Sequence, residues 1–415
     1  MMKVRYIYSA CVVIETPDVK ILCDPWFTPG AYYGSWHQYP SLPRDPVDII
    51  GEVDLIWISH VHPDHYDPVF LRKYMERYPD AQIVISTTGQ GMLAKKLDKD
   101  GFHWETTKEP RHVDGTSTVK VFKNNAYAWE IDAALVVKHG GQAVIHMNDC
   151  PLDPRQIAAI NELNERCRTF ALLPYSGAGP YPQCYEFPTE EDKLEAAKTK
   201  KQQFLGLYDK YIKALNPTMA MPFAGQYWFG GPLAGLNAYR GVADAVEATW
   251  MAPERSVLLA DGGEAVFDLD TMEASEVRTE RYKGLFNILN GVKRWDYEKE
   301  ITQLDGLELS IEKMMLAIEP IGDIKEDYWF MINPIDHTRT YAWSPGSRVT
   351  SYEGHKDWSG LEPRTEITVD PRLLFGLLKG RYNWNTAEIG GHLQFRRVPD
   401  IHNRAAHHAL QSLHV

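Results

Sequence analysis

Positions 59–65 bring together side chains that bind transition metals. They read Ser-His-Val-His-Pro-Asp-His, so three imidazoles and one carboxylate fall within six residues. This ligand set suits zinc, iron or manganese. A single histidine is more often a surface or core residue than a ligand, but a buried cluster of this kind would be costly to desolvate without a metal. The stretch therefore predicts a metal site.

The spacing of these ligands predicts two metal ions. His60 and His62 are two residues apart, so in an extended chain their side chains face the same side. Asp64 and His65 come after Pro63 and can turn toward a second centre. One loop could thus serve two ions.

The elements around this stretch predict that it is a loop at the end of a strand. Residues 54–58 are Asp-Leu-Ile-Trp-Ile, an apolar run that indicates a buried strand. Pro63 and Asp67-Pro68 then prevent a helix until about Val69. The next expected elements are a helix over 69–78, a strand over 82–86 and a helix over 90–97. This alternation indicates an α/β layer structure.

More strands are expected before and after the loop. Strands over 4–16 and 19–23 flank Pro17-Asp18, which predicts a β-hairpin closed by the Asp-Pro-Trp segment at 24–26. Later strands are expected over 119–122, 133–137 and 142–147, with Gly140-Gly141 as the turn between the last two. The last strand ends in Asn-Asp-Cys, where Asp149 is either a solvated turn residue or a carboxylate beside the metals.

The pattern His-x-His-x-Asp-His after a strand resembles the signature of the metallo-β-lactamase superfamily. The resemblance implies an α/β fold, an αββα sandwich, over residues 1–267. It implies that His60 and His62 serve one metal and that Asp64 and His65 serve the other. Asp149 would be the bridging carboxylate. Asp64 and Asp149 are then also expected to be catalytic residues.

Four further motifs resemble the non-Rieske part of the CMP-N-acetylneuraminate hydroxylase family, in the ascorbate-lactonase-like branch. They are Asp-Pro-Trp at 24–26, Asp-Cys at 149–150, Gly-Ala-Gly at 177–179 and Pro-Phe-Ala-Gly at 222–225. Weaker similarities lie at 384, 388–390, 396–402 and 407–408. Gly-rich loops let a backbone approach a ligand, and amide and phenol groups can orient sugar hydroxyls or a phosphate. We therefore expect Tyr175, Gln226 and Tyr227 to bind substrate.

The chain departs from that family at three points. A Rieske cluster needs Cys-x-His and Cys-x-x-His pairs, and no cysteine here has a histidine at either spacing. The family has a histidine before the strand that leads to Asp149, and residues 124–130 here contain none. The ligand set of the first metal is therefore either incomplete or completed by Glu130, His112 or His146. A final histidine after 222–225 is also absent. We expect the second metal to bind weakly, or only with substrate.

Two reactions are open to such a site. A dinuclear zinc or manganese centre activates a bridging water, which would give a hydrolase of a phosphoester, lactone or amide. With iron, the same ligands can reduce dioxygen and hydroxylate a C–H bond, as the hydroxylase resemblance implies. We favour a diiron oxygenase that takes electrons from a separate ferredoxin or Rieske protein, and the resemblance alone suggests a small polar, sugar-nucleotide-like substrate. A non-catalytic metal-binding protein is the third reading.

Composition sets wider bounds. The chain has 415 residues, 44% of them hydrophobic, which is enough for one large domain and a smaller one. A formal net charge of −12 argues against wrapping nucleic acid. There is no apolar run of about 18 residues, so no membrane span is expected. Five cysteines without a Cys-x-x-Cys pair, and no signal peptide, predict a cytoplasmic protein.

The composition changes near Asp268, so residues 268–415 are expected to form a C-terminal lid or dimerisation module, similar to a sterol-carrier α/β layer. Helices are expected over 190–214 and 298–318, and strands over 328–332 and 366–369. A further helix should begin at Asp370 with Pro371 in its first turn.

Overall fold

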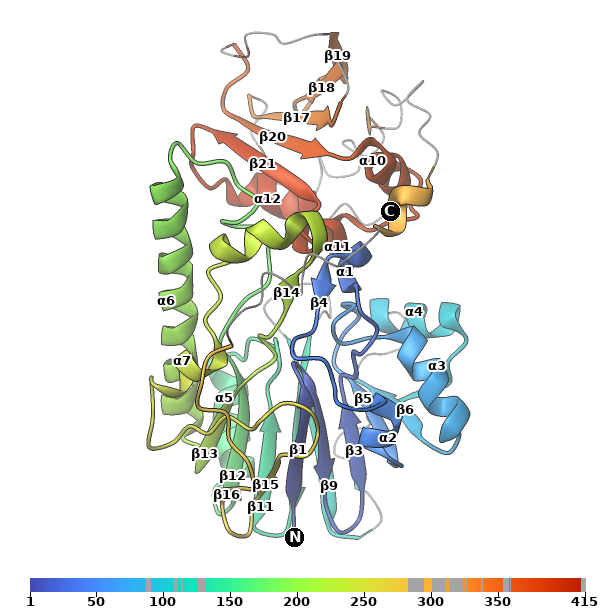
Figure 1. Cartoon of the computed structure of the whole chain (residues 1–415), viewed down its shortest axis with the longest axis vertical. Helices are drawn as coiled ribbons and strands as arrows, with labels where there is room; N and C mark the ends of the chain where they lie inside the picture. The colour runs from blue at the N-terminus through green and yellow to red at the C-terminus, as the bar shows by residue number, and fades with distance from the viewer. Residues whose placement is uncertain are drawn as a thin grey trace.

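Two β-sheets packed face to face form the larger part of the protein (Figure 1). The computed structural model describes residues 1–86, 91–107, 111–112, 115–124, 132–282, 295–300, 311–312, 324, 327–336, 339–353, 358 and 360–411.

The first sheet has eight strands in the order β16-β15-β1-β2-β3-β5-β6-β7. Their bounds are β1 Lys3–Tyr8, β2 Cys11–Glu15, β3 Lys20–Cys23, β5 Leu55–Ile58, β6 Gln82–Ile85, β7 Trp104–Thr106, β15 Val266–Asp268 and β16 Glu273–Ala274. Strands β3, β5, β6 and β7 run parallel, so their carboxyl ends meet at one edge. Asp24, which follows β3, is therefore a neighbour of the His60–His65 loop, which follows β5.

The second sheet has six strands in the order β13-β12-β11-β10-β9-β8. Their bounds are β8 Arg111–His112, β9 Ser117–Lys123, β10 Ala133–His139, β11 Gln142–His146, β12 Arg168–Pro174 and β13 Met219–Phe223. β10 and β11 form the predicted hairpin, and Gly140 in its turn has a φ of 57°, a conformation that glycine adopts without strain.

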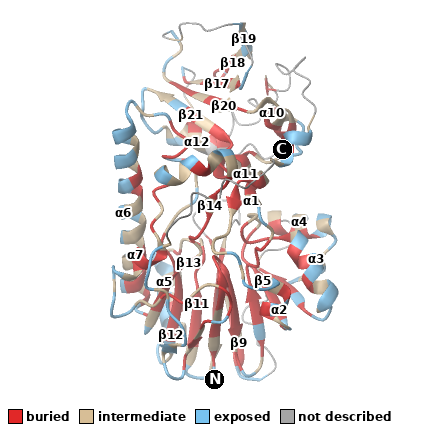
Figure 2. Ribbon diagram, in the orientation of Figure 1, coloured by how far each residue is buried: buried red, intermediate tan, exposed pale blue. Residues whose placement is uncertain are grey.

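Helices cover the outer face of each sheet, which gives the predicted αββα sandwich. Over the first sheet lie α2 Pro46–Ile50, α3 Pro68–Arg77 and α4 Met92–Asp100, and over the second lie α5 Pro154–Leu163, α6 Glu190–Leu215 and α7 Ala245–Thr249. Both faces of β5 are buried: Leu55 and Trp57 pack between the sheets, and Ile56 and Ile58 pack under the helices (Figure 2). This explains the continuous apolar run.

The predicted strand over 4–16 is wrong in one respect. Two antiparallel strands, β1 and β2, occupy this stretch, and Val4 pairs with Ile14. Ser9 in the turn has a φ of 50°, so the chain reverses there instead of continuing as one extended strand. The hairpin predicted around Pro17-Asp18 is present between β2 and β3.

The C-terminal residues form a third layer with a hydrophobic core of its own. Its five-stranded sheet has the order β19-β18-β17-β20-β21. The bounds are β17 Trp329–Pro334, β18 Arg339–Trp343, β19 Thr350–Glu353, β20 Arg364–Val369, β21 Leu393–Val398, α10 Pro371–Leu378, α11 Trp384–Ile389 and α12 Arg404–Gln411. Asp370 caps α10 as predicted, accepting a hydrogen bond from the Arg372 backbone N–H at 2.8 Å.

Two further predictions concern the same half of the chain. Most of the helix predicted over 298–318 lies outside the described residues. At its start the structure describes only a short 3₁₀ segment, η2 Asp296–Lys299. β15 and β16 belong to the first sheet and lie on both sides of residue 268, and the division there stays a prediction. In the described part of the chain, no helix is both long and apolar enough to cross a membrane.

Short elements join the C-terminal layer to the sandwich above the strand ends (Figure 1). They are α1 Ala31–Gly34, β4 Trp36–His37, β14 Trp228–Phe229 and the 3₁₀ helix η1 Gly231–Tyr239. Tyr32 and Trp36 share a buried cluster with Tyr227 and with Ile389 of α11. Segments far apart in the sequence therefore meet beside the His60–His65 loop.

Candidate metal centre

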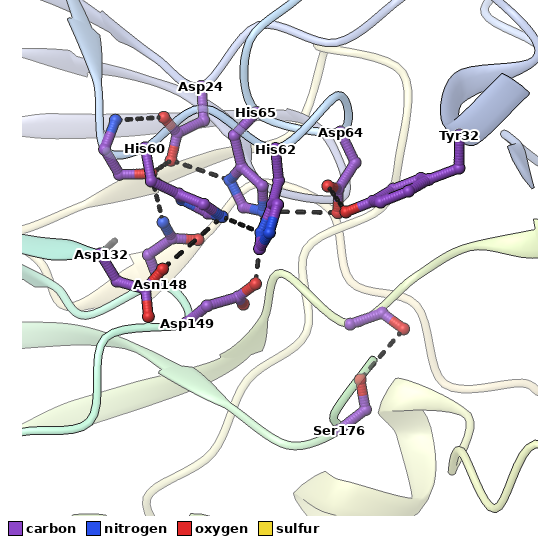
Figure 3. A network of polar contacts seen from close by, with 12 residues as sticks. Asp24, Tyr32, His60, His62, Asp64, His65, Asp132, Asn148, Asp149 and Ser176 are labelled. Carbon is purple, nitrogen blue, oxygen red and sulfur yellow. Dashed lines mark hydrogen bonds and ion pairs between the residues drawn. The ribbon is translucent and has the colours of Figure 1, made fainter. Parts of the chain in front are cut away.

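The three histidines of the His60–His65 loop converge in the structure. His60 is 1% exposed and His65 is fully buried. The Nε2 atom of His60 lies 2.8 Å from Nδ1 of His62, and the rings of His60 and His65 have their centroids 4.1 Å apart. Figure 3 shows the three rings pointing into one space, with Asp64, Asp132 and Asp149 around it.

His60, His62 and Asp132 form one group of candidate ligands. One ligand atom from each lies within 4.8 Å of the others, and His60 Nε2 is 3.7 Å from Asp132 Oδ1. Asp132 was not among the metal ligands predicted from the sequence. Of the residues considered there, Glu130 and the His112 side chain lie outside the described residues. His146 is buried against Phe223 and belongs to neither ligand group.

The register of β10 and β11 explains why Asp132 is here. The two strands are antiparallel and Leu135 lies opposite His146. Asp132 precedes Leu135 by three residues and Asp149 follows His146 by three, so the two carboxylates leave the sheet side by side. A carboxylate just before β10 was the available signal in the sequence.

His60, His65 and Asp149 form the second group of candidate ligands, and Asp64 lies beside His65. His65 Nε2 lies 3.4 Å from an oxygen of Asp64 and 3.4 Å from an oxygen of Asp149. This nitrogen is buried and has no hydrogen-bond partner among the described residues. His60 belongs to both groups, and Asp149 of the second group lies near enough to Asp132 of the first for its charge to raise the pKa of Asp132. The structure thus brings together all five predicted metal residues, while their role as ligands stays a prediction.

Asp24 holds His65 in place from the far side. One oxygen of Asp24 accepts a hydrogen bond from the Ser59 N–H at 2.8 Å, and the other accepts from the Ser59 hydroxyl at 2.8 Å. That second oxygen is 3.2 Å from His65 Nδ1, so the Nδ1 proton has an acceptor and Nε2 is left for the cluster. The Asp-Pro-Trp motif therefore has a structural role.

Two more residues support the ligands from distant segments. The hydroxyl of Tyr32, a buried residue of α1, donates a hydrogen bond to Asp64 Oδ1 at 2.6 Å. Asn385 in α11 places its side-chain oxygen 3.0 Å from His62 Nε2. This contact turns His62 Nδ1 toward His60 and Asp132.

The electrostatics of the cluster suit divalent cations. Burial lowers the pKa of His60 well below its usual value, and the neighbouring His65 and His62 lower it further, so the ring stays neutral. Burial, together with the charge of Asp149, raises the pKa of Asp132 to about 7. Burial opposes a charge on His65, but Asp64, Asp149 and Asp24 outweigh it and raise its pKa. A cation would relieve the repulsion between the carboxylates.

The predicted substrate residues Tyr175, Gln226 and Tyr227 line one cavity of about 40 Å³. All three are buried, and Gln226 donates a hydrogen bond to the Tyr39 carbonyl at 2.8 Å. Tyr227 stacks on Trp36 with ring centroids 3.5 Å apart. Substrate binding by these residues remains a prediction.

A model of the β-lactamase superfamily domain matches residues 3–163. A putative Rieske 2Fe-2S iron-sulfur protein of Mycolicibacterium smegmatis is 32% identical over 58% of this chain and 47% of that protein. Cytidine monophosphate-N-acetylneuraminic acid hydroxylase of Macaca mulatta is 24% identical over 97% of this chain and 70% of that protein.

Among solved structures, the chain is similar to a metallo hydrolase from the archaeon Ignicoccus hospitalis, with a TM-score of 0.41 and 19% identity over 64% of this chain and 98% of that chain. The chain spans about half the length of the mycobacterial relatives it matches. The expected resemblance to these families is confirmed.

Proposed function

We propose that the cluster around His60 holds two divalent metal ions and that the protein is a metalloenzyme, since residues 3–163 match the model of the β-lactamase superfamily domain. The first ion would be held by His60, His62 and Asp132. The second would be held by Asp64, His65 and Asp149, with Asp149 shared between the two. The buried Nε2 atom of His65 makes no hydrogen bond among the described residues and lies 3.4 Å from two carboxylates, which supports this assignment because a metal between them would take its lone pair.

We further propose that the metal is iron and that the reaction is the hydroxylation of a small polar substrate. The observation that carries this is the group His60, His62 and Asp132. Two imidazoles and one carboxylate form an open ligand set that non-haem iron(II) oxygenases use, and catalytic zinc sites use it as well. When bound by such ligands, iron supplies the reduction of dioxygen and the oxidation of a C–H bond. The side chain of Asp149 is 34% exposed, which leaves a path from solvent to the cluster.

The protein's own residues would orient the ligands and exclude water. Asp24 fixes the tautomer of His65, and Tyr32 holds one oxygen of Asp64, which leaves the other oxygen for a metal. The stacked rings of Trp36 and Tyr227 close the side of the cluster next to Tyr32. An apolar wall of this kind strengthens the electrostatic interactions inside the site.

An oxygenase of this kind would need an external source of electrons. This chain has no cysteine and histidine pairs for a Rieske cluster, so a separate Rieske protein or ferredoxin is the proposed donor. The names of the mycobacterial and hydroxylase relatives support such a partner, and they also support a sugar-nucleotide-like substrate class.

A metal-dependent hydrolase is the alternative function. Asp149 lies beside both ligand groups, and a carboxylate shared by two zinc or manganese ions would hold them close enough to activate a bridging water. A binding protein without catalysis would use the same ligands. These functions differ in metal identity and in their need for electrons.

Metal analysis after anaerobic purification tests the proposal. We expect about two iron ions per chain and an optical charge-transfer spectrum. Colourless zinc or manganese would instead support the hydrolase. Asp132→His gives a matched variant, because a third imidazole in the first group should shift its preference from iron toward zinc. Iron content unchanged in this variant would contradict the role of Asp132.

A further inference from the structure

Arg240 is a buried cation without an acidic partner in the described part of the chain. The residue is 5% exposed, and its guanidinium donates one hydrogen bond, to the Tyr227 carbonyl. The guanidinium carbon lies 4.9 Å from the centroid of the Tyr227 ring and 4.4 Å from that of Trp228. The Nε atom has no hydrogen-bond partner among the described residues. The positive charge is therefore held by aromatic rings and one carbonyl.

Other well-buried arginines are paired with carboxylates. Arg364 lies 2.7 Å from Glu366 and 3.0 Å from Glu362. Arg278 lies 2.9 Å from Asp244. A buried guanidinium that lacks such a partner is costly to desolvate, unless an anion supplies the missing charge.

A second buried cation lies next to Arg240 in the fold. Lys200 in α6 is 8% exposed, and its ammonium donates a hydrogen bond to the Tyr181 carbonyl at 2.8 Å. Burial and the nearby Arg240 lower the pKa of Lys200 to about 8. No carboxylate among the described residues pairs with it. The region thus carries uncompensated positive charge although the whole chain is acidic.

Arg240 faces the cavity lined by the predicted substrate residues. The cavity measures about 40 Å³, and Tyr175, Gln226, Tyr227 and Arg278 also line it. The Tyr227 hydroxyl and the Nε atom of Arg240 are buried without hydrogen-bond partners among the described residues, whereas Nε of Arg278 lies 3.7 Å from a carboxylate oxygen of Asp261. The space is larger than a single water needs, and its unused groups are donors.

One carboxylate, Asp244, lines the same cavity. One of its oxygens accepts hydrogen bonds from Arg278 at 2.9 Å and from the Val246 N–H at 3.0 Å. The other accepts from the Tyr282 N–H at 3.2 Å. These donors compensate the charge of Asp244. Asp244 therefore does not balance the charge of Arg240.

We propose that this cavity is an oxyanion subsite in which Arg240 binds a phosphate or carboxylate group of the substrate. The inference deepens the proposed function, on which it rests for the position of the reacting centre. A continuous set of contacts joins the two places: Tyr227 stacks on Trp36, Trp36 packs on Tyr32 with centroids 4.4 Å apart, and the Tyr32 hydroxyl donates to Asp64. An anionic group bound by Arg240 would therefore lie on the far side of the Trp36 and Tyr32 rings from Asp64.

Calorimetric titration of the full chain, depleted of metal, with inorganic phosphate and separately with acetate tests the subsite. We expect binding, and Arg240→Met should raise the dissociation constant roughly 10- to 100-fold, the loss expected for a hydrogen bond to a charged group. Tighter phosphate binding indicates a phosphorylated substrate, and tighter acetate binding indicates a carboxylate. Arg240→Lys keeps the charge but loses the planar fork, so its loss should be smaller.

Arg364→Met is the matched control, because Arg364 is equally buried but ion-paired and lies outside the cavity. It should lower stability and leave anion binding unchanged. Binding of neither anion to the wild type, or equal binding by Arg240→Met and wild type, would overturn the subsite. Metal content of the same variants separates the two proposals: anion binding through Arg240 without metal uptake contradicts the metalloenzyme, and metal uptake without anion binding contradicts the subsite.

Discussion

Replacing Asp132 with asparagine should make the metal-free protein more stable at alkaline pH and weaken its metal binding. Asp132 stands beside Asp149 with a side chain that is 14% exposed. Burial and the charge of Asp149 raise its pKa from 3.8 to about 7. An amide keeps the shape of the side chain and removes the charge, so the variant isolates the electrostatic contribution.

The magnitude follows from the pKa. The difference between 3.8 and about 7 is about three pH units, and at 1.36 kcal/mol for each unit it corresponds to roughly 4 kcal/mol. The folded state binds the proton more tightly than the unfolded state, so the free energy of unfolding falls as pH rises through this window. Below pH 3.8 the carboxyl is protonated in both states and the effect is absent.

Urea unfolding of protein stripped of metal by a chelator measures this effect. Between about pH 5 and about pH 8 the wild type should lose roughly 3 kcal/mol of unfolding free energy from this group, and Asp132→Asn should not lose this part. Asp48→Asn is the control, because Asp48 is an exposed carboxylate in α2, outside the cluster. With divalent metal added, the order should reverse: the wild type gains stability and the asparagine variant gains less.

The reasoning is refuted if the wild type and Asp132→Asn lose stability equally as pH rises. That result would mean that Asp132 is solvated and does not face Asp149. If added metal raises the free energy of unfolding equally in both proteins, Asp132 is not a ligand, whatever the pH profile.

Three further predictions concern the remaining ligands and their supports. Asp149→Asn should fold normally, bind about one metal ion fewer per chain and lose turnover, as measured by metal analysis and activity; wild-type metal content would make Asp149 a turn residue only. Tyr32→Phe removes the hydrogen bond to Asp64 and should lower the affinity for the second ion roughly tenfold in a metal titration. Its circular dichroism spectrum should show unchanged secondary structure. Asn385→Ala frees His62 Nε2 and should lower affinity for the first ion roughly 10- to 100-fold; an unchanged affinity would show that the C-terminal layer does not position the ligand.

The sequence was informative wherever the determinants are local. The His60–His65 loop follows from Pro63 and from the Asp67-Pro68 helix start, since Asp67 accepts a hydrogen bond from the Phe70 N–H. Asp149 could be predicted because it ends an apolar strand and matches a family motif. Such features depend on neighbours a few residues away, so the printed order of residues is enough to recognise them.

Contacts between distant segments were decided only by the tertiary structure. Asp132 reaches the cluster through the register of β10 and β11 and the packing of one sheet on the other. Asn385 lies 323 residues after His62, and its contact depends on how the C-terminal layer docks above the sandwich. That the Nε atom of Arg240 is buried without a hydrogen-bond partner among the described residues can likewise be seen only once the surroundings of its side chain are known. Spacing along the chain cannot encode these neighbours, because hydrophobic packing over the whole fold sets which surfaces meet.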